Sequence, residues 1–256
     1  MTIIVSTKPI KVPPLRVRVT APRERDETPV ILFSHGFGSS YDAYGPLVDH
    51  WATAGFAVIQ PTHLDSRRLN VPVTADSWRR RVDDLKAILD RLEILVPGHT
   101  TVAVAGHSFG GQTAGNLLGL RVHGEDHRDE RVTAGVLLAT AGRGGDDLAD
   151  TPFRDWLSPD FSHMSTPALV VVGDRDDSPL TTRGPDWTAD PYHLSPGPKA
   201  LLTLAGAEHS LGGIPGYEAR ETTDENPAHV ATIQRVTTAF LKGESLAGVA
   251  GVQLRA

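Results

Sequence analysis

The chain has 256 residues, 39% of them hydrophobic, which is enough to bury the core of one α/β domain. Its net charge of -6 provides no basic face for nucleic acid, and the absence of cysteine excludes disulfides, thiolate metal sites and a cysteine nucleophile. No apolar run is long enough to span a membrane, and the N-terminus lacks the pattern of a signal peptide. We therefore expect a cytoplasmic protein without a membrane or nucleic-acid partner, and secretion stays open if a signal was removed.

Short apolar runs alternate with helical patterns along the chain, which is typical of a mostly parallel sheet with helices on both faces. No break in composition suggests a domain boundary, so residues 1–256 are predicted to form a single, doubly wound α/β domain. The predicted strands are residues 15–19, 30–33, 56–59, 102–105, 136–139, 169–172 and 200–204.

Two segments show an apolar stripe at helical spacing. The first runs from Trp78 to Leu92 behind a possible N-terminal cap, Asp76. The second begins at Asn226 and has Pro227 in its first turn, which is a common start for a helix. Both stripes indicate contact with a hydrophobic core rather than with a cofactor.

Residues 106–111 read Gly-His-Ser-Phe-Gly-Gly, between the predicted strand 102–105 and a stretch that can be helical. Gly-x-Ser-x-Gly in this context is the pattern of a nucleophile elbow, a strained turn that presents a serine hydroxyl. The two outer glycines lack the Cβ atoms that would collide across such a turn. Ser108 is therefore the predicted nucleophile, and the backbone N–H of Phe109 is a candidate oxyanion donor.

A serine hydroxyl needs a base to take its proton, and the base needs a group that orients it. His209, just after the predicted strand 200–204, is the candidate base, because imidazole as a side chain can both accept and return a proton. Three carboxylates after the predicted strand 169–172 compete for the orienting role. Their spacing from the strand favours Asp176, with Asp177 as the substitute and Asp174 behind both.

A second oxyanion donor is expected in the loop after the predicted strand 30–33, which reads Ser-His-Gly-Phe-Gly-Ser-Ser. The flanking glycines allow the N–H of Phe37 to turn inward, so Phe37 is the candidate.

Four motifs, at residues 35–38, 106–111, 173–176 and 206–209, together resemble serine hydrolases of the α/β-hydrolase superfamily over nearly the whole chain. Within the superfamily the chain looks like the bacterial branch of chlorophyllase-like, dienelactone-hydrolase-like and polyester-hydrolase-like carboxylesterases. The resemblance implies an α/β-hydrolase fold with at most a small cap, no cofactor and a small-molecule ester as substrate.

The chain departs from two members of this branch. Polyester hydrolases typically carry a tryptophan just after the strand that precedes the acid strand, and residues 139–144 contain no aromatic residue. Dienelactone hydrolases proper use a cysteine nucleophile, which this chain lacks. Neither of these two activities is therefore favoured.

Two long inserts, residues 141–167 and 178–198, are expected to cover the site, the first as a small cap or loop. Their large apolar residues either line an apolar pocket or attach the inserts to the body of the domain. Those residues are Phe153, Trp156, Phe161, Met164, Trp187 and Tyr192. Phe37, His63 and Trp187 are the candidate substrate-binding residues, although a structural role is the favoured alternative for His63.

The sequence predicts a carboxylic ester hydrolase that works through an acyl-enzyme. The same residues would serve an acyltransferase, thioesterase, lactonase or perhydrolase, and a non-catalytic binding protein is the remote alternative. No metal is expected, because His-Gly-Glu-Asp-His at residues 123–127 departs from the zinc-protease pattern and fits a solvated loop. No phosphate-binding or dinucleotide-binding loop is present in the sequence, and the oligomeric state is not indicated.

Overall fold

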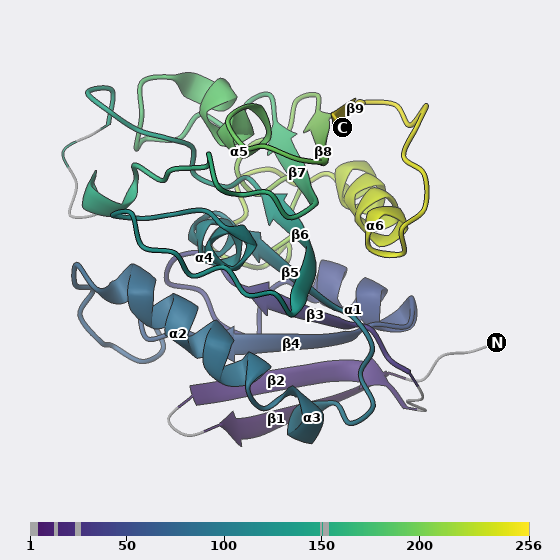
Figure 1. Ribbon diagram of the computed structural model, residues 1–256. Helices are drawn as coiled ribbons and strands as arrows, with labels where there is room; N and C mark the ends of the chain where they lie inside the picture. The colour runs from purple at the N-terminus through teal and green to yellow at the C-terminus, as the bar shows by residue number, and fades with distance from the viewer. Residues whose placement is uncertain (1–4, 13–14, 24–26, 149, 151–153, 256) are drawn as a thin grey trace.

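The computed structural model describes residues 5–12, 15–23, 27–148, 150 and 154–255. Its centre is a nine-stranded sheet in the order β1-β2-β4-β3-β5-β6-β7-β8-β9, shown in Figure 1. The strands are β1 (Val5–Val12), β2 (Leu15–Pro22), β3 (Val30–Ser34), β4 (Ala57–Thr62), β5 (Val102–His107), β6 (Val132–Leu138), β7 (Ala168–Gly173), β8 (Lys199–Leu204) and β9 (Val252–Arg255).

The strands from β4 to β8 are parallel, whereas β1, β2 and β9 pair antiparallel at the two edges. The predicted mostly parallel, doubly wound sheet is therefore confirmed, and all seven predicted strands are present with shifts at their ends. The two outermost strands, β1 and β9, were missing from the prediction. Edge strands of this kind are hard to find from sequence, because they lack the continuous apolar run of a strand buried on both faces.

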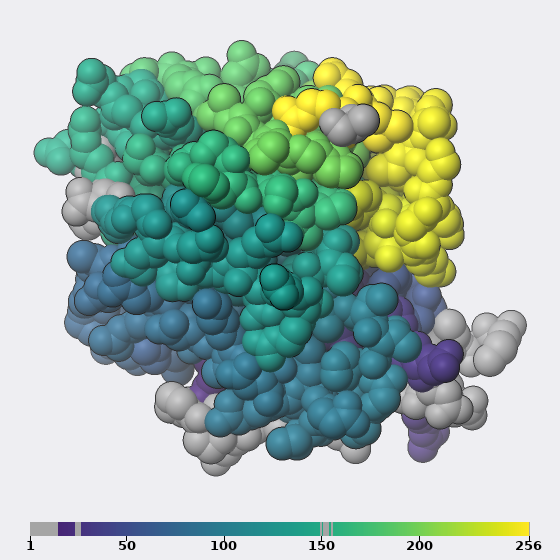
Figure 2. Space-filling view, in the orientation of Figure 1, coloured from purple at the N-terminus to yellow at the C-terminus, as the bar shows by residue number. Residues whose placement is uncertain are grey.

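Helices cover both faces of the sheet. The helices are α1 (Gly45–Thr53), α2 (Ser77–Leu89), α3 (Leu92–Leu95), α4 (Phe109–Leu118), α5 (Asp190–His193) and α6 (Pro227–Leu241), with short 3-10 helices at Arg154–Trp156 and Gly184–Ala189. One core contains apolar residues of α2, α4 and α5, and the other contains those of α1 and α6. In the space-filling view the blue segment around α2 and the green segment around α5 accordingly lie on the same side of the molecule (Figure 2).

The two predicted apolar helices are present, with different boundaries. The first ends at Leu89, and Leu92 begins the separate turn α3. Asp76 stands at the N-cap position of α2, but its side chain makes no cap hydrogen bond, so the expected cap is wrong. The side chain of Asn226 does cap α6, since it accepts hydrogen bonds from the N–H groups of Ala228 and His229.

The chain reverses its direction of travel across the sheet next to β3. It passes from β3 to β4 on one side and then returns to form β5 on the other side of β3. Ligands of open α/β sheets bind at such a switch point, beyond the carboxyl ends of the strands. The segments that follow β3, β5, β7 and β8 all start at this edge, and they contain every residue of the predicted catalytic set.

Candidate functional site

The turn after β5 has the geometry of a nucleophile elbow. Ser108 lies at φ 55° and ψ -122°, a strained conformation for a residue with a side chain. A Cβ atom on Gly106 would lie 2.1 Å from the carbonyl oxygen of Gly110, and one on Gly110 would lie 2.0 Å from that of Ser34. Both positions therefore require glycine, and this close approach holds the Ser108 hydroxyl at the apex of the turn.

His209 lies between Ser108 and Asp176. Its Nε2 is 2.9 Å from the Ser108 hydroxyl oxygen, and its Nδ1 is 3.0 Å from each carboxylate oxygen of Asp176. Because a carboxylate only accepts hydrogen bonds, Nδ1 of His209 carries the proton, and Nε2 is left to accept one from the serine hydroxyl. This is the tautomer that a general base for Ser108 requires.

The three candidate acids differ in their burial and in their contacts. Asp176 is fully buried behind His209, which is where an orienting carboxylate has to lie. Asp177 is exposed and lines the cavity described below, and Asp174 accepts a hydrogen bond from the backbone N–H of Gly206. Sequence spacing favoured Asp176, and only its contact with His209 distinguishes it from its neighbours.

The two candidate oxyanion donors lie on facing segments. Phe109 is the first residue of α4, where backbone N–H groups point out of the helix end. Phe37 lies in the loop after β3, followed by Gly38 with a φ of +72° that favours glycine. The rings of Phe37 and Phe109 are 6.4 Å apart, and both residues line the same cavity as Ser108.

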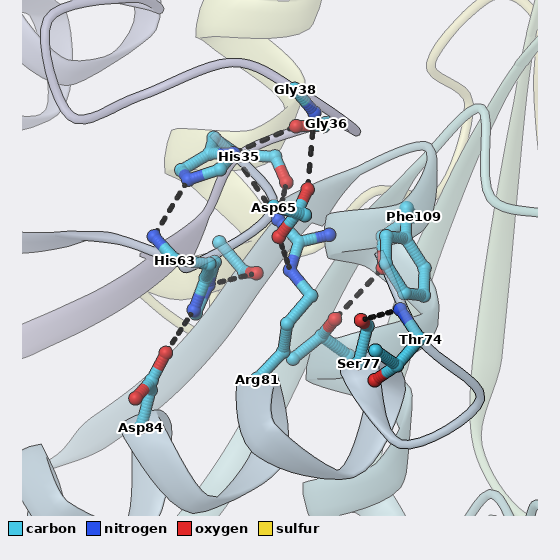
Figure 3. A network of polar contacts seen from close by, with 12 residues as sticks. His35, Gly36, Gly38, His63, Asp65, Thr74, Ser77, Arg81, Asp84 and Phe109 are labelled. Carbon is cyan, nitrogen blue, oxygen red and sulfur yellow. Dashed lines mark hydrogen bonds and ion pairs between the residues drawn. The ribbon is translucent and has the colours of Figure 1, made fainter. Parts of the chain in front are cut away.

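A buried ion pair lies behind the loop that contains Phe37 (Figure 3). Arg81, from α2, donates a hydrogen bond to the carbonyl of His35 and lies 3.4 Å from the Asp65 carboxylate. Asp65 accepts a hydrogen bond from the N–H of Gly38 at 3.1 Å. The Arg81 guanidinium also lies over the Phe109 ring, 4.4 Å from its centre. The pair thus contacts the loop on both sides of Phe37.

Sequence reasoning missed this pair. Arg81 was not among the residues that the sequence singled out, yet it is 1% exposed. A signal was present, because Arg81 follows Trp78 by three residues and precedes Leu85 by four, and therefore lies on the apolar stripe of the helix. A charge on a buried stripe requires a buried partner, which here is Asp65.

The structure places His63 away from the cavity, so its assignment to substrate binding is wrong. The side chain is fully buried beneath the loop after β3. Its Nε2 lies 3.0 Å from the Ser34 hydroxyl and its Nδ1 lies 2.8 Å from the Asp84 carboxylate. Burial holds the pKa of His63 well below its usual value and raises that of Asp84 to about 7. Both ring nitrogens contact protein side chains, which agrees with the structural role that was the favoured alternative.

A cavity of about 740 Å³ has Ser108 and His209 in its wall. Its apolar lining consists mainly of Phe37, Phe109, Trp156, Leu157, Leu180 and Trp187. Charged side chains lie at other points of the lining, where Arg67 and Glu221 form an ion pair at 2.9 Å. Such a cavity fits a ligand with a large apolar part and one polar group near Ser108.

The two inserts divide their aromatic residues between the cavity and the core. Trp156 and Trp187 line the cavity, and the Trp156 ring packs 5.0 Å from the ring of Phe109. Phe161, Met164 and Tyr192 are instead buried in the core that contains residues of α2 and α4. The assignment of Phe37 and Trp187 to the pocket therefore agrees with their positions. Phe153 lies outside the described residues.

The segment at residues 123–127 forms surface contacts. Glu125 pairs with Arg79 and lies 3.1 Å from Nε2 of His127. Across the described residues, no group of three or more metal-ligating side chains could hold an ion. Within the same residues, no helix is both long and apolar enough to cross a bilayer.

Comparison with known proteins shows similarity to chlorophyllases. The family model for chlorophyllase matches residues 1–125. Over 107 residues the chain is 33% identical to chlorophyllase-1 of Citrus unshiu, covering 40% of this chain and 32% of the relative. Over 176 residues it is 26% identical to chlorophyllase-2 of Arabidopsis thaliana, covering 66% and 54% respectively. The chain thus spans about a third to a half of the length of these relatives.

An esterase of Pyrobaculum calidifontis has the same fold. It superposes with a TM-score of 0.71 at 19% identity, over 94% of this chain and 86% of the esterase. The α/β-hydrolase fold and the resemblance to its chlorophyllase-like branch are therefore confirmed.

Proposed function

We propose that this protein is a serine hydrolase that cleaves carboxylic esters. The observation that carries the proposal is the position of His209, with Nε2 2.9 Å from the Ser108 hydroxyl and Nδ1 3.0 Å from both oxygens of Asp176. The similarity to chlorophyllases, which are carboxylic ester hydrolases, supports the same reaction class.

In the proposed reaction, the Ser108 hydroxyl attacks the ester carbonyl and gives its proton to Nε2 of His209. The carbonyl oxygen becomes an oxyanion, stabilised by the N–H groups of Phe37 and Phe109. His209 then returns the proton to the leaving alcohol as the carbon–oxygen bond breaks. Water, activated by the same imidazole, hydrolyses the acyl-enzyme to the acid and restores Ser108.

Asp176 orients the base and stabilises its charge. Its buried carboxylate keeps the proton of neutral His209 on Nδ1. When His209 takes the serine proton it becomes an imidazolium, and the adjacent negative charge favours this form. In this mechanism the proton stays on the imidazole and is not passed on to Asp176.

The cavity suggests the substrate class. Its apolar and aromatic lining favours an ester whose acyl or alcohol part is bulky and apolar. Trp156 and Trp187, from the two inserts, contribute to this lining. Because the names of the relatives point to chlorophyll, chlorophyll belongs in the test panel beside simple esters.

The test is turnover of p-nitrophenyl esters of increasing acyl length by wild type and by Ser108→Ala. We expect kcat/KM to rise with acyl length in the wild type and turnover to be lost in the variant. Ser178 also lines the cavity, so Ser178→Ala is the matched control and should retain activity. Full activity of Ser108→Ala would rule out the proposal.

Two further measurements separate the alternatives. Labelling with a fluorophosphonate should modify Ser108, and a folded protein that forms no adduct would indicate a binding protein without catalysis. Product partition between water and an added alcohol distinguishes hydrolysis from acyl transfer, and we expect the free acid to dominate.

A further inference from the structure

Tyr44 and His107 form a chain of buried hydrogen bonds beneath the candidate site. The Gly36 N–H donates to the Tyr44 hydroxyl at 2.9 Å, and this hydroxyl lies 2.9 Å from Nδ1 of His107. On the other side of the ring, Nε2 of His107 lies 2.8 Å from the carbonyl oxygen of His209. Both residues reach the lining of the cavity, but Tyr44 is fully buried and His107 is only 2% exposed, so water competes little for these contacts.

The partners determine the direction of every hydrogen bond in this chain. The His209 carbonyl can only accept, so Nε2 of His107 carries a proton. In a neutral imidazole Nδ1 is then an acceptor, and the Tyr44 hydroxyl must donate to it. The oxygen of that hydroxyl accepts the Gly36 N–H, so each donor meets an acceptor.

This pattern requires a neutral His107. Burial, and secondly the neighbouring His209, lower the pKa of His107 to about 3, so it stays neutral at physiological pH. Burial also raises the pKa of Tyr44 above its usual value, which keeps the hydroxyl proton in place.

These hydrogen bonds connect three segments that are distant in sequence. Gly36 belongs to the loop with the candidate oxyanion donor Phe37, His107 directly precedes Ser108, and His209 is the candidate base. Tyr44 adds a fourth contact, because its backbone N–H donates to the carbonyl of Pro215, in the same segment as His209.

We infer that Tyr44 and His107 are positioning residues that hold the oxyanion loop, the nucleophile turn and the backbone of the catalytic histidine in one arrangement. The inference rests on the proposed function, since it assigns these residues a role in the proposed ester hydrolysis. A misplacement of about 1 Å can slow an enzyme about 100-fold, so a small shift between these segments is sufficient to impair the reaction.

Three substitutions test separate hydrogen bonds. Tyr44→Phe removes the bridging hydroxyl and keeps the ring that packs 4.8 Å from Phe33. His107→Asn keeps an acceptor near the position of Nδ1 and loses the donor to the His209 carbonyl. His107→Gln keeps a donor near the position of Nε2 and loses the acceptor for Tyr44. We expect each to lower kcat by about 10-fold to 100-fold and to leave KM within about twofold.

A double-mutant cycle between Tyr44→Phe and His107→Gln tests whether the hydrogen bonds of Tyr44 and His107 affect kcat together. Both substitutions break the bond between Tyr44 and His107, so the double variant should be little slower than the slower single variant. Losses in kcat that multiply would show two independent effects and would contradict the inference.

Thr237→Val is the matched control. It removes another buried hydrogen bond, which Trp51 Nε1 donates to the Thr237 hydroxyl at 3.0 Å. Thr237 lies on α6, outside the three segments. We expect it to lower the melting temperature and leave kcat unchanged. A general structural effect of losing a buried hydrogen bond would instead lower kcat in the control as well.

A folded Tyr44→Phe with the wild-type kcat and the wild-type rate of fluorophosphonate labelling would overturn the inference alone. A wild type that turns over no ester and forms no adduct would overturn the proposed function and the inference with it. Should Tyr44→Phe fail to fold, the two His107 variants carry the test, since each keeps a polar side chain at this position.

Discussion

Both carboxylate oxygens of Asp176 lie 3.0 Å from Nδ1 of His209, and the carboxylate is fully buried. Asp177, the next residue, is exposed to solvent. Two adjacent carboxylates therefore differ in their surroundings, and we expect their substitution to affect kcat very differently.

Asp176→Asn should lower kcat by about 10³-fold to 10⁴-fold, because an amide no longer selects the tautomer of His209 that can accept the serine proton. Asp177→Asn should change kcat by less than about twofold, since screened surface charges interact weakly. Steady-state kinetics on one p-nitrophenyl ester measures both. Equal losses in the two variants would contradict the assignment of Asp176.

Gly110→Ala should prevent the elbow from forming, because its Cβ atom would lie 2.0 Å from the carbonyl oxygen of Ser34. We expect destabilisation of about 3 kcal/mol or more, measured by urea unfolding, or a failure to express in soluble form. Gly45→Ala, whose Cβ atom would lie 3.7 Å from a carboxylate oxygen of Asp49, is the control and should fold normally. A stable Gly110→Ala with wild-type activity would argue against the close packing of this turn.

Phe37→Ala should reduce the preference for long acyl chains. Phe37 is a partly exposed apolar residue of the cavity wall, and the loss of part of its contact with a substrate costs about 1.4 kcal/mol, or about tenfold in kcat/KM. The ratio of kcat/KM for octanoate to that for acetate is the measurement. Phe240→Ala, on the opposite face of the sheet, should leave this ratio unchanged.

Arg81→Leu should destabilise the protein by about 3–5 kcal/mol, because it leaves the buried carboxylate of Asp65 without a cation. Adding Asp65→Asn removes that charge and retains an acceptor for the Gly38 N–H. The double variant should therefore be more stable than Arg81→Leu in denaturant unfolding. A double variant less stable than the single one would show that the ion pair is not the dominant contact.

Acid should destabilise the protein through its buried histidines. Burial lowers the folded-state pKa of His35, His63 and His107, the last to about 3, so the unfolded chain binds more protons below about pH 6.5. Stability from His107 is therefore present above pH 6.5 and is lost as the pH falls toward 3, by about 1.4 kcal/mol per pH unit. Asp84 acts in the opposite direction, since its raised pKa of about 7 lets the folded state bind the extra proton.

The free energy of unfolding at several pH values between 7 and 4 tests this prediction. His107→Gln should show a shallower decrease than the wild type, whatever its stability at pH 7. An unchanged slope would mean that His107 is not held neutral in the folded protein.

Much of the fold was predictable, because the strands from β3 to β8 are apolar runs and α6 carries a readable cap and stripe. The edge strands β1 and β9 were missed. The predicted cap was also wrong, since the Asp76 side chain makes no cap hydrogen bond, and the turn instead has one from the Thr74 N–H to the Ser77 hydroxyl. Such local alternatives differ by too little energy for the sequence pattern to separate them.

The sequence by itself determined the nucleophile candidate and its candidate base, because the Gly-x-Ser-x-Gly turn and the order of the strands allow few other arrangements. Only the tertiary structure distinguished Asp176 from Asp177, through the contact of Asp176 with His209. It also showed that His63 is buried in the interior, and that Tyr44 and His107 lie in contact with the backbone of His209. The physical reason is that burial and hydrogen-bond partners depend on segments far apart in the chain, and no local pattern of residue types records which of those segments meet.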